Sequence, residues 1–121
     1  NVVCIPHLGA STLEAEDNCA IMASKELKDY IENGNIVNSV NFPTCQAPRG
    51  SEIRLTILHE NKQNILVDFS SILSEIGVNI ENFINSSKGS FAYSIIDIPH
   101  IDDESFEKMS KIDGIIKIRK I

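Results

Sequence analysis

The sequence predicts an α+β fold in which a long helix precedes a small domain of four strands and two helices. Residues 11–34 carry apolar side chains at helical spacing, over about twenty residues. From residue 53 onward short segments alternate in the order strand, helix, strand, strand, helix, strand. This β-α-β-β-α-β order is typical of a split-βαβ, ferredoxin-like sheet that carries both helices on one face.

The long helix is expected to begin at Ser11 and to end at Gly34. Ser11 and Glu14 have the spacing of a capping box, in which the hydroxyl accepts from the third helical amide. Gly34 stands where a helix would stop. The apolar stripe between them needs a partner surface. It consists of Ala15, Cys19, Met22, Ala23, Leu27, Tyr30 and Ile31.

Residues 35–52 are punctuated by proline and glycine and have little periodicity. We therefore expect a linker at 42–52 that contributes little to a core. The sequence thus divides into three segments, which are residues 1–41, the linker 42–52, and a domain at 53–121.

The domain at 53–121 can be followed element by element. Residues 53–59 predict a strand, and Gly77 ends the helix that follows it. Residues 78–86 and 91–98 predict a hairpin in which Gly89 takes a positive φ. Asp102 or Asp103 caps a short helix, and residues 115–121 predict the last strand. The first helix places these apolar side chains on one face: Ile65, Leu66, Phe69, Ile72, Leu73 and Ile76.

Composition excludes several classes of protein. The 121 residues include 11 Lys and Arg and 17 Asp and Glu, and a net charge of -6 disfavours nucleic acid as a partner. The six glycines are too far apart for a dinucleotide or P-loop motif. The three cysteines form no C-x-x-C pair, so we expect buried free thiols in a reducing compartment and no metal site. Without a long apolar run or a leader-like start, we expect a cytoplasmic protein that does not bind membranes.

Two loops of the domain carry candidate ligand-binding residues. His59 and Asn61 follow the first strand, where the free amides of the next helix can bind a carboxylate. Asn79 follows the same helix at its other end, and two Asn amides suit the ammonium and hydroxyl of a small zwitterion. Taken singly, both Asn residues are also ordinary cap and turn residues, and His59 is equally explained as a strand-end residue.

Several motifs together resemble the carboxyl-terminal third of the D-3-phosphoglycerate dehydrogenase family. These are Pro6-His7-Leu8-Gly9-Ala10-Ser11-Thr12, Asn38-Ser39-Val40-Asn41-Phe42-Pro43, His59-Glu60-Asn61 and Gly77-Val78-Asn79, in this order and spacing. The first motif resembles NAD-dependent D-2-hydroxyacid dehydrogenases. The later ones resemble the ACT domain that binds serine in feedback-inhibited members. The resemblance implies that the chain is a fragment, which comprises the end of the catalytic region and the whole regulatory domain.

For the amino-terminal segment, the resemblance implies one member of a catalytic site. His7 matches the general acid/base for hydride transfer, a role that suits an imidazole. His7, Leu8, Gly9 and Ala10 match the segment that lies against the NAD cofactor. The family's orienting Glu and carboxylate-binding Arg come from upstream sequence that is missing here. We therefore expect no NAD binding and no turnover from this chain alone, with residues 1–41 belonging against the missing catalytic domains.

For the domain, the resemblance implies amino-acid sensing in serine biosynthesis. His59, Asn61 and Asn79 match the contacts of L-serine, which lies between two ACT domains paired edge to edge. The resemblance therefore also implies that ACT domains associate with one another and that serine inhibits the enzyme allosterically. However, many ACT domains continue after the Asn with a residue, Pro and Gly, whereas this chain has Lys62-Gln63-Asn64. The alternative is therefore an ACT-like dimerisation module that binds no effector, and another small amino acid in place of serine also stays open.

Overall fold

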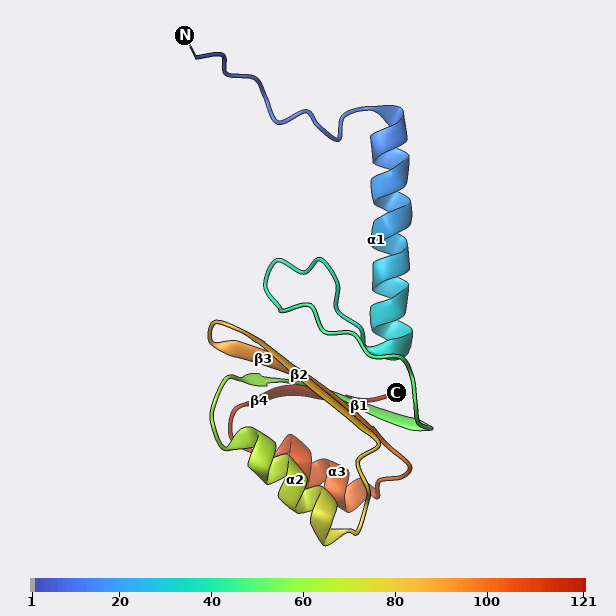
Figure 1. The fold of residues 1–121 in the computed structure, drawn as a ribbon, viewed down its shortest axis with the longest axis vertical. Helices are drawn as coiled ribbons and strands as arrows, with labels where there is room; N and C mark the ends of the chain where they lie inside the picture. Colours follow the sequence, from blue (N-terminus) through green and yellow to red (C-terminus); the bar gives the residue numbers. More distant parts are fainter. Residues whose placement is uncertain (1) are drawn as a thin grey trace.

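The fold was obtained as a computed structural model that describes residues 2–121, so that Asn1 of the amino-terminal segment lies outside the described residues. The elements are α1 (Leu13–Asn33), β1 (Ile53–Glu60), α2 (Ile65–Glu75), β2 (Asn82–Lys88), β3 (Phe91–Ile98), α3 (Asp103–Ser110) and β4 (Ile115–Lys120). The strands form one antiparallel sheet in the order β2-β3-β1-β4. Helices α2 and α3 cover one face, and α1 rises from the other side (Figure 1). The predicted ferredoxin-like α+β fold with a preceding long helix is confirmed.

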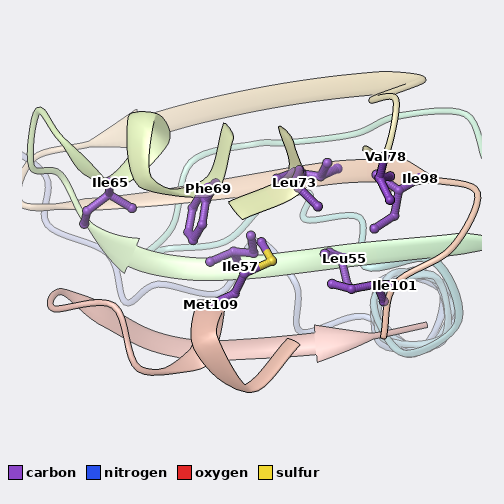
Figure 2. Packing of buried hydrophobic residues seen from close by; sticks show 10 residues of the cluster. Leu55, Ile57, Ile65, Phe69, Leu73, Val78, Ile98, Ile101 and Met109 are labelled. Carbon is purple, nitrogen blue, oxygen red and sulfur yellow. The ribbon is translucent and has the colours of Figure 1, made fainter. Parts of the chain in front are cut away.

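The main core lies between the sheet and the two helices α2 and α3. Alternate side chains of β1, such as Leu55 and Ile57, point to this face because successive residues of a strand face opposite ways. Phe69 and Leu73 of α2 pack against them, as Figure 2 shows. Each fully buried side chain of this size contributes about 1.5–3 kcal/mol. The buried cluster contains Leu55, Ile57, Ile65, Phe69, Leu73, Val78, Ile96, Ile98, Ile101 and Met109.

A second, smaller core covers the opposite face of the sheet. Ile36 and Cys45 form an isolated antiparallel bridge, and both are buried with Ala47 against Tyr93 and Ile95 of β3. The expectation that the linker at 42–52, within the irregular stretch 35–52, contributes little to a core is therefore wrong. This stretch, which we call the strap, has no apolar periodicity because it covers the sheet as an irregular segment, and only single side chains point inward. Among the cysteines, Cys45 is buried, whereas Cys4 and Cys19 are exposed, so burial was predicted correctly for one thiol only.

Helix α1 begins one residue later than predicted. The Thr12 hydroxyl, and not that of Ser11, accepts from the amide of Ala15 at 3.1 Å. The Ser11 amide is instead used in a turn onto the carbonyl of Leu8. The carboxyl end is as expected, because Gly34 adopts a left-handed φ of 71° and donates its amide to the carbonyl of Tyr30.

Apart from Tyr30, which packs against the second core, the apolar stripe of α1 has no partner among the residues that the structure describes. No residue of α1 is buried, and Met22, Leu27 and Ile31 are 54%, 59% and 56% exposed. The helix stands clear of the sheet over most of its length (Figure 1). The prediction that this stripe requires another surface therefore still stands.

The remaining element boundaries agree with the sequence except at β2. That strand runs from Asn82 to Lys88, whereas 78–86 was expected. Val78 belongs to the main core instead, and its amide bonds the carbonyl of Leu73 behind α2. Gly77 and Gly89 have the predicted positive φ, and Asp102 caps α3 by accepting from the amide of Ser105 at 2.7 Å.

The two glycines that end α1 and α2 give a matched test of how closely α1 approaches the sheet. Gly34 and Gly77 both have positive φ, but a Cβ on Gly34 would collide with the Thr56 side chain, whereas Gly77 faces open space. We predict that Gly77→Ala lowers the unfolding free energy by about 1–2 kcal/mol, from backbone strain alone. Gly34→Ala adds overpacking and loses about 2–4 kcal/mol. Equal losses in urea unfolding would contradict the close approach of Gly34 to β1.

Candidate functional site

The carboxyl end of α1 is held by side chains of the sheet and the strap. The last carbonyls of a helix lack internal partners and carry the negative end of the helix dipole, so cationic donors stabilise them. All three arginines of the sequence are used here, together with a phenol. Arg119 donates to the carbonyls of Tyr30 (3.2 Å) and Ile31 (2.8 Å), Arg49 to Glu32 (3.1 Å), Arg54 to Asn33 (3.1 Å), and Tyr93 to Gly34 (2.7 Å). We call Arg49, Arg54, Arg119 and Tyr93 the α1 clamp.

Arg54 of this clamp is fully buried and paired with Asp97. Its Nε lies 2.6 Å from Oδ1 and its Nη2 lies 2.8 Å from Oδ2, which is a bidentate pair between adjacent strands β1 and β3. Its remaining donors reach the carbonyls of Ala47 (2.9 Å) and Pro48 (2.8 Å) of the strap. Burial raises the pKa of Asp97, but the hydrogen bonds and charge of Arg54 outweigh it and leave that pKa below its ordinary value.

Tyr93 stays a hydrogen-bond donor throughout the physiological pH range. Burial raises its pKa to about 12, so the phenol keeps the proton that it gives to the carbonyl of Gly34. Arg119 also stacks over the ring of Tyr30, with its guanidinium carbon 5.0 Å from the ring centre. The clamp therefore contains only groups that remain in one protonation state near neutral pH.

Sequence reasoning missed the clamp, although a signal for it was present. Arg54 interrupts the apolar run Ile-Arg-Leu-Thr-Ile-Leu, and Asp97 interrupts Ile-Ile-Asp-Ile. Charges inside two apolar strands indicate a buried pair, since lone buried charges are too costly. The use of all arginines on one helix end could not be read from the sequence, because it depends on contacts between residues far apart along the chain.

The loop at residues 60–64 joins β1 to α2 and presents Asn61 to solvent. Its shape comes from the carbonyl of Glu60, which accepts the amide of Lys62 at 2.9 Å. Asn61 is anchored to the β2–β3 turn, since its amide donates to Ser90 (2.9 Å) and its side-chain nitrogen donates to Gly89 (3.2 Å). Its side-chain oxygen has no protein donor among the hydrogen bonds of residues 2–121, so it can accept one from a ligand.

Charged and helical groups complete this end of the domain. Lys62 pairs with Glu60 at 2.7 Å and Asp113 at 3.1 Å, and hydrogen bonds from these two carboxylates raise its pKa. Asn64 precedes α2 but makes no side-chain cap. The first amides of α2 therefore have no side-chain acceptor, which leaves them open to an anion.

His59 lies beneath this loop and is almost completely buried, with 2% exposure. Its Nδ1 lies 2.7 Å from the carbonyl of Glu60, and its Nε2 lies 3.0 Å from the hydroxyl of Ser94. The ring also meets Phe69 of α2 edge to face, with 6.0 Å between centres. Both nitrogens thus have protein partners, and the direct ligand contact predicted for His59 stays a prediction.

Asn79 is exposed and lies beyond the opposite end of α2 from Asn61. The 11-residue helix between them is about 16 Å long. One chain therefore does not bring Asn61 and Asn79 together, and their predicted role in one effector site also stays a prediction.

The predicted catalytic and cofactor-binding residues stand apart from this domain. His7, Leu8, Gly9 and Ala10 are exposed on the extended segment that leads away from α1 (Figure 1). A Cβ placed on Gly9 would meet no other atom within 4 Å. Across residues 2–121, no group of three or more His, Cys, Asp or Glu side chains could hold a metal ion. No helix of the described chain combines the length and apolar character needed to span a membrane.

A separate cavity of about 380 Å³ lies between α1, the strap and the sheet. Its apolar lining includes Leu27, Tyr30, Phe42, Leu58 and Tyr93. Two of its polar lining residues are already bonded within the chain, since Asn35 donates to Asp29 and Glu26 accepts from Asn38.

The described residues therefore define a ferredoxin-like domain with ligand-accessible loops at both ends of α2, joined through a clamp to one long helix. No protein-family model matches the chain. The chain is 34% identical to D-3-phosphoglycerate dehydrogenase of Escherichia coli K12 over 98% of its own length. It is 33% identical to that of Haemophilus influenzae and 32% identical to D-3-phosphoglycerate dehydrogenase 1 of Saccharomyces cerevisiae, again over 98% of this chain.

These matches make the chain a homologue of D-3-phosphoglycerate dehydrogenase. It spans about 30% of the length of the bacterial relatives and 27% of the yeast one, and it matches their carboxyl-terminal region. Among solved structures, the ACT domain of GTP pyrophosphokinase from Chlorobium tepidum matches 57% of this chain and 95% of its own. That match has 15% identity and a TM-score of 0.49.

The buried pair of Arg54 and Asp97 gives a prediction on stability. Asp97→Asn keeps the shape of the side chain but leaves the Arg54 charge uncompensated, so we expect a loss of about 3–5 kcal/mol in urea unfolding. The exposed pair of Lys28 and Glu32 provides the control, and Glu32→Gln should leave stability near that of the wild type.

The pair of Arg54 and Asp97 also determines how the stability of the folded chain changes with pH. Because the pKa of Asp97 is lower in the folded chain than its ordinary 3.8, its stabilisation is fully present above the ordinary value and is lost as the pH falls from there through the lower pKa of the folded chain. Asp97→Asn should therefore lose more stability at pH 7 than at pH 3. An equal loss at both pH values would show that the carboxylate charge is not what stabilises the clamp.

Proposed function

We propose that this chain is the regulatory and self-associating region of a D-3-phosphoglycerate dehydrogenase, an ACT domain that binds a small amino acid. L-serine is the first candidate, since it is the end product that feedback control of such an enzyme would sense. The observation that carries the proposal is the position of Asn61 and Asn79 at opposite ends of α2. Each contributes half of a zwitterion site, and a second copy supplies the other half.

The sheet topology supports such pairing through β2. This strand is an edge strand, with β3 on one side only. In two-fold pairing of two β2 edges, the strands run antiparallel, so the start of one lies beside the end of the other. Asn79 precedes the start of β2 at Asn82. The loop at 60–64 lies at its other end, because Glu60 pairs with Phe91, which in turn pairs with Lys88.

Exposed apolar residues also lie on the helix-covered side of the domain. Phe83 pairs with the core residue Ile96, so it faces the helix-covered side of the sheet, yet 43% of it is exposed. Val67 of α2 is 61% exposed on a shallow surface hollow that it shares with Leu66 and Ser70. Burying these side chains against a second copy would favour association. Edge pairing would at the same time satisfy the free backbone groups of β2.

Such a site would contact the carboxylate, the ammonium and the hydroxyl group of serine. The uncapped first turn of α2 would bind the carboxylate, because its amides are free and the helix dipole favours an anion. The side-chain oxygen of Asn61 would accept from the ammonium or the hydroxyl group. The Asn79 amide of the partner copy would bind the remaining polar group. Binding across two copies favours one relative orientation of the domains, and this preference is what inhibition requires.

Two observations favour a second function, that of an ACT-like module that dimerises without an effector. The side-chain nitrogen of Asn61 already donates to Gly89, and Asn64 adds a side chain where many ACT domains have glycine. The bond to Gly89 and the side chain of Asn64 both reduce the room that the loop at 60–64 leaves for a ligand. The two functions differ only in whether a ligand completes the interface.

Residues 2–10 fit this proposal as a piece of the catalytic region. His7 would be the acid/base residue, and Leu8, Gly9 and Ala10 would lie against NAD in the complete enzyme. The partner Glu and Arg of such a site would come from sequence outside this chain. We therefore expect the 121-residue chain to bind no NAD and to oxidise no 3-phosphoglycerate.

A mixing experiment tests the shared site. Asn61→Ala and Asn79→Ala each destroy both sites of a dimer, so titration calorimetry with L-serine should detect no binding to either variant. When the two are unfolded together and refolded, half of the dimers are mixed, and each mixed dimer regains one intact site. The mixture should then show about one quarter of the wild-type site number, with wild-type affinity.

Asn18→Ala, an exposed change on α1, serves as the control and should bind serine like the wild type. If the wild type binds serine but mixing restores nothing, the site is not shared between two copies. If millimolar serine gives no heat with the wild type while the chain is dimeric, the effector-free module is correct.

A further inference from the structure

A chain of hydrogen bonds leads from the surface of β2 to the carbonyl beneath the loop at 60–64. It begins at Asn85, which is exposed on the edge strand. The hydroxyl of Ser94 donates to Oδ1 of Asn85 at 2.9 Å, and Nε2 of His59 lies 3.0 Å from that hydroxyl. Nδ1 of His59 lies 2.7 Å from the carbonyl of Glu60. Ser94 and His59 are 0% and 2% exposed, so these hydrogen bonds run along the helix-covered face of the sheet, from solvent at β2 into the core.

The direction of these bonds sets the charge of His59. A carbonyl only accepts, so Nδ1 must carry a proton. Ser94 has a single hydroxyl proton. When that proton goes to Oδ1 of Asn85, the Ser94 oxygen can only accept from Nε2, and the imidazole is then protonated on both nitrogens.

The alternative direction follows from turning the Asn85 amide. With its NH₂ group toward Ser94, the hydroxyl donates to Nε2 instead, and the imidazole is neutral. The amide oxygen and nitrogen occupy equivalent positions, so both directions fit the same heavy-atom positions. The orientation of one surface amide and the charge of one buried ring are thus coupled.

No other charged group competes for this ring among the described residues. Phe69 faces it from α2, Ile115 is its register partner on β4, and Ala92 is its partner on β3. The charged side chains of the adjoining loops are Glu60, Lys62 and Asp113, and these are paired with one another. The Ser94 hydroxyl is therefore the partner that decides the state of Nε2.

The ring in turn acts on the loop that carries Asn61. The Glu60 carbonyl accepts both from Nδ1 of His59 and from the amide of Lys62, so one oxygen holds the ring and the turn together. Any shift of the ring moves this oxygen and hence the presentation of Asn61. The ring also contacts Phe69, in the second turn of α2.

We propose that Asn85 and Ser94 are positioning residues of the effector site, which act through the protonation and orientation of His59. The protonated form of His59 strengthens the hydrogen bond to Glu60 and adds a positive charge beside the carboxylate position. The claim on ligand affinity rests on the proposed function, whereas the coupling between Asn85 and His59 does not.

An isosteric substitution tests the coupling on the 121-residue chain. In Asn85→Asp the new carboxylate only accepts, so it draws the Ser94 proton and leaves Nε2 as a donor. ¹⁵N NMR of the His59 ring nitrogens should show uptake of the second proton at a pH about one unit higher than in the wild type. Asn85→Leu frees the hydroxyl to donate to Nε2, and its uptake should shift to lower pH.

Ser87→Asp is the matched control for a charge without contact. Ser87 is exposed on the same face of β2, and its register partner Ala92 pairs with His59. With neighbouring strands ~4.8 Å apart, position 87 lies about 10 Å from His59, which is nearer than the diagonal position 85. A shift in Ser87→Asp as large as in Asn85→Asp would overturn the proposal, because it would show a through-space effect. The proposal would also be overturned if Asn85→Asp still shifted the pH of proton uptake by His59 in a chain that carries Ser94→Ala.

Calorimetry with L-serine then separates the coupling from its effect on the ligand. At pH 7, Asn85→Asp should bind serine several-fold more tightly than Ser87→Asp, and Ser94→Ala about tenfold more weakly than the wild type. If serine binds and neither difference appears, the positioning role is wrong. If no variant binds serine, the proposed effector function fails, and the NMR comparison alone decides whether Asn85 controls His59.

Discussion

The buried ion pair between Arg54 and Asp97 is the contact on which the arrangement of the chain depends. It joins the two central strands, and the same guanidinium holds the strap at Ala47 and Pro48 and the last turn of α1 at Asn33. A buried guanidinium must have all its donors satisfied, since unpaired charge in the interior is strongly destabilising. Three segments that are distant in sequence are thus required to meet at one point.

In this arrangement the carboxyl end of α1 is fixed to the sheet, and the rest of the helix is free of it. The clamp binds each carbonyl of the last turn of α1, while the rest of the helix is exposed with its apolar stripe uncovered. A helix held at one end moves with the sheet to which it is clamped. If an effector reorients paired sheets at the β2 edge, α1 would carry that movement toward whatever covers its stripe. Strand β3 lies between the β2 edge and Arg54 of β1, and β3 and β1 lie between that edge and Arg119 of β4, so the β2 edge and the clamp share one sheet.

Most of the fold could be predicted from the sequence, because local signals and global packing agree. The apolar face of α2, Gly77, the hairpin at Gly89 and the cap at Asp102 are local features, and each was predicted correctly. The strap was missed because it has no period, and the start of β2 was misplaced because Val78 is apolar without being in a strand. The predicted loop residues could be named, but their separation by the length of α2 depends on topology. The roles of Ser94 and Asn85 depend on strand register, which no local pattern reveals.

Amide hydrogen exchange along α1 tests the central claim most directly. If the clamp joins helix and sheet into one unit, the amides of Ile31, Glu32 and Asn33 open only with the free energy of the sheet, as do Leu55 and Ile57. The amides in the first turns of α1 should exchange much faster, since no tertiary contact protects them. Fast and uniform exchange along the whole of α1, beside a protected sheet, would contradict the account.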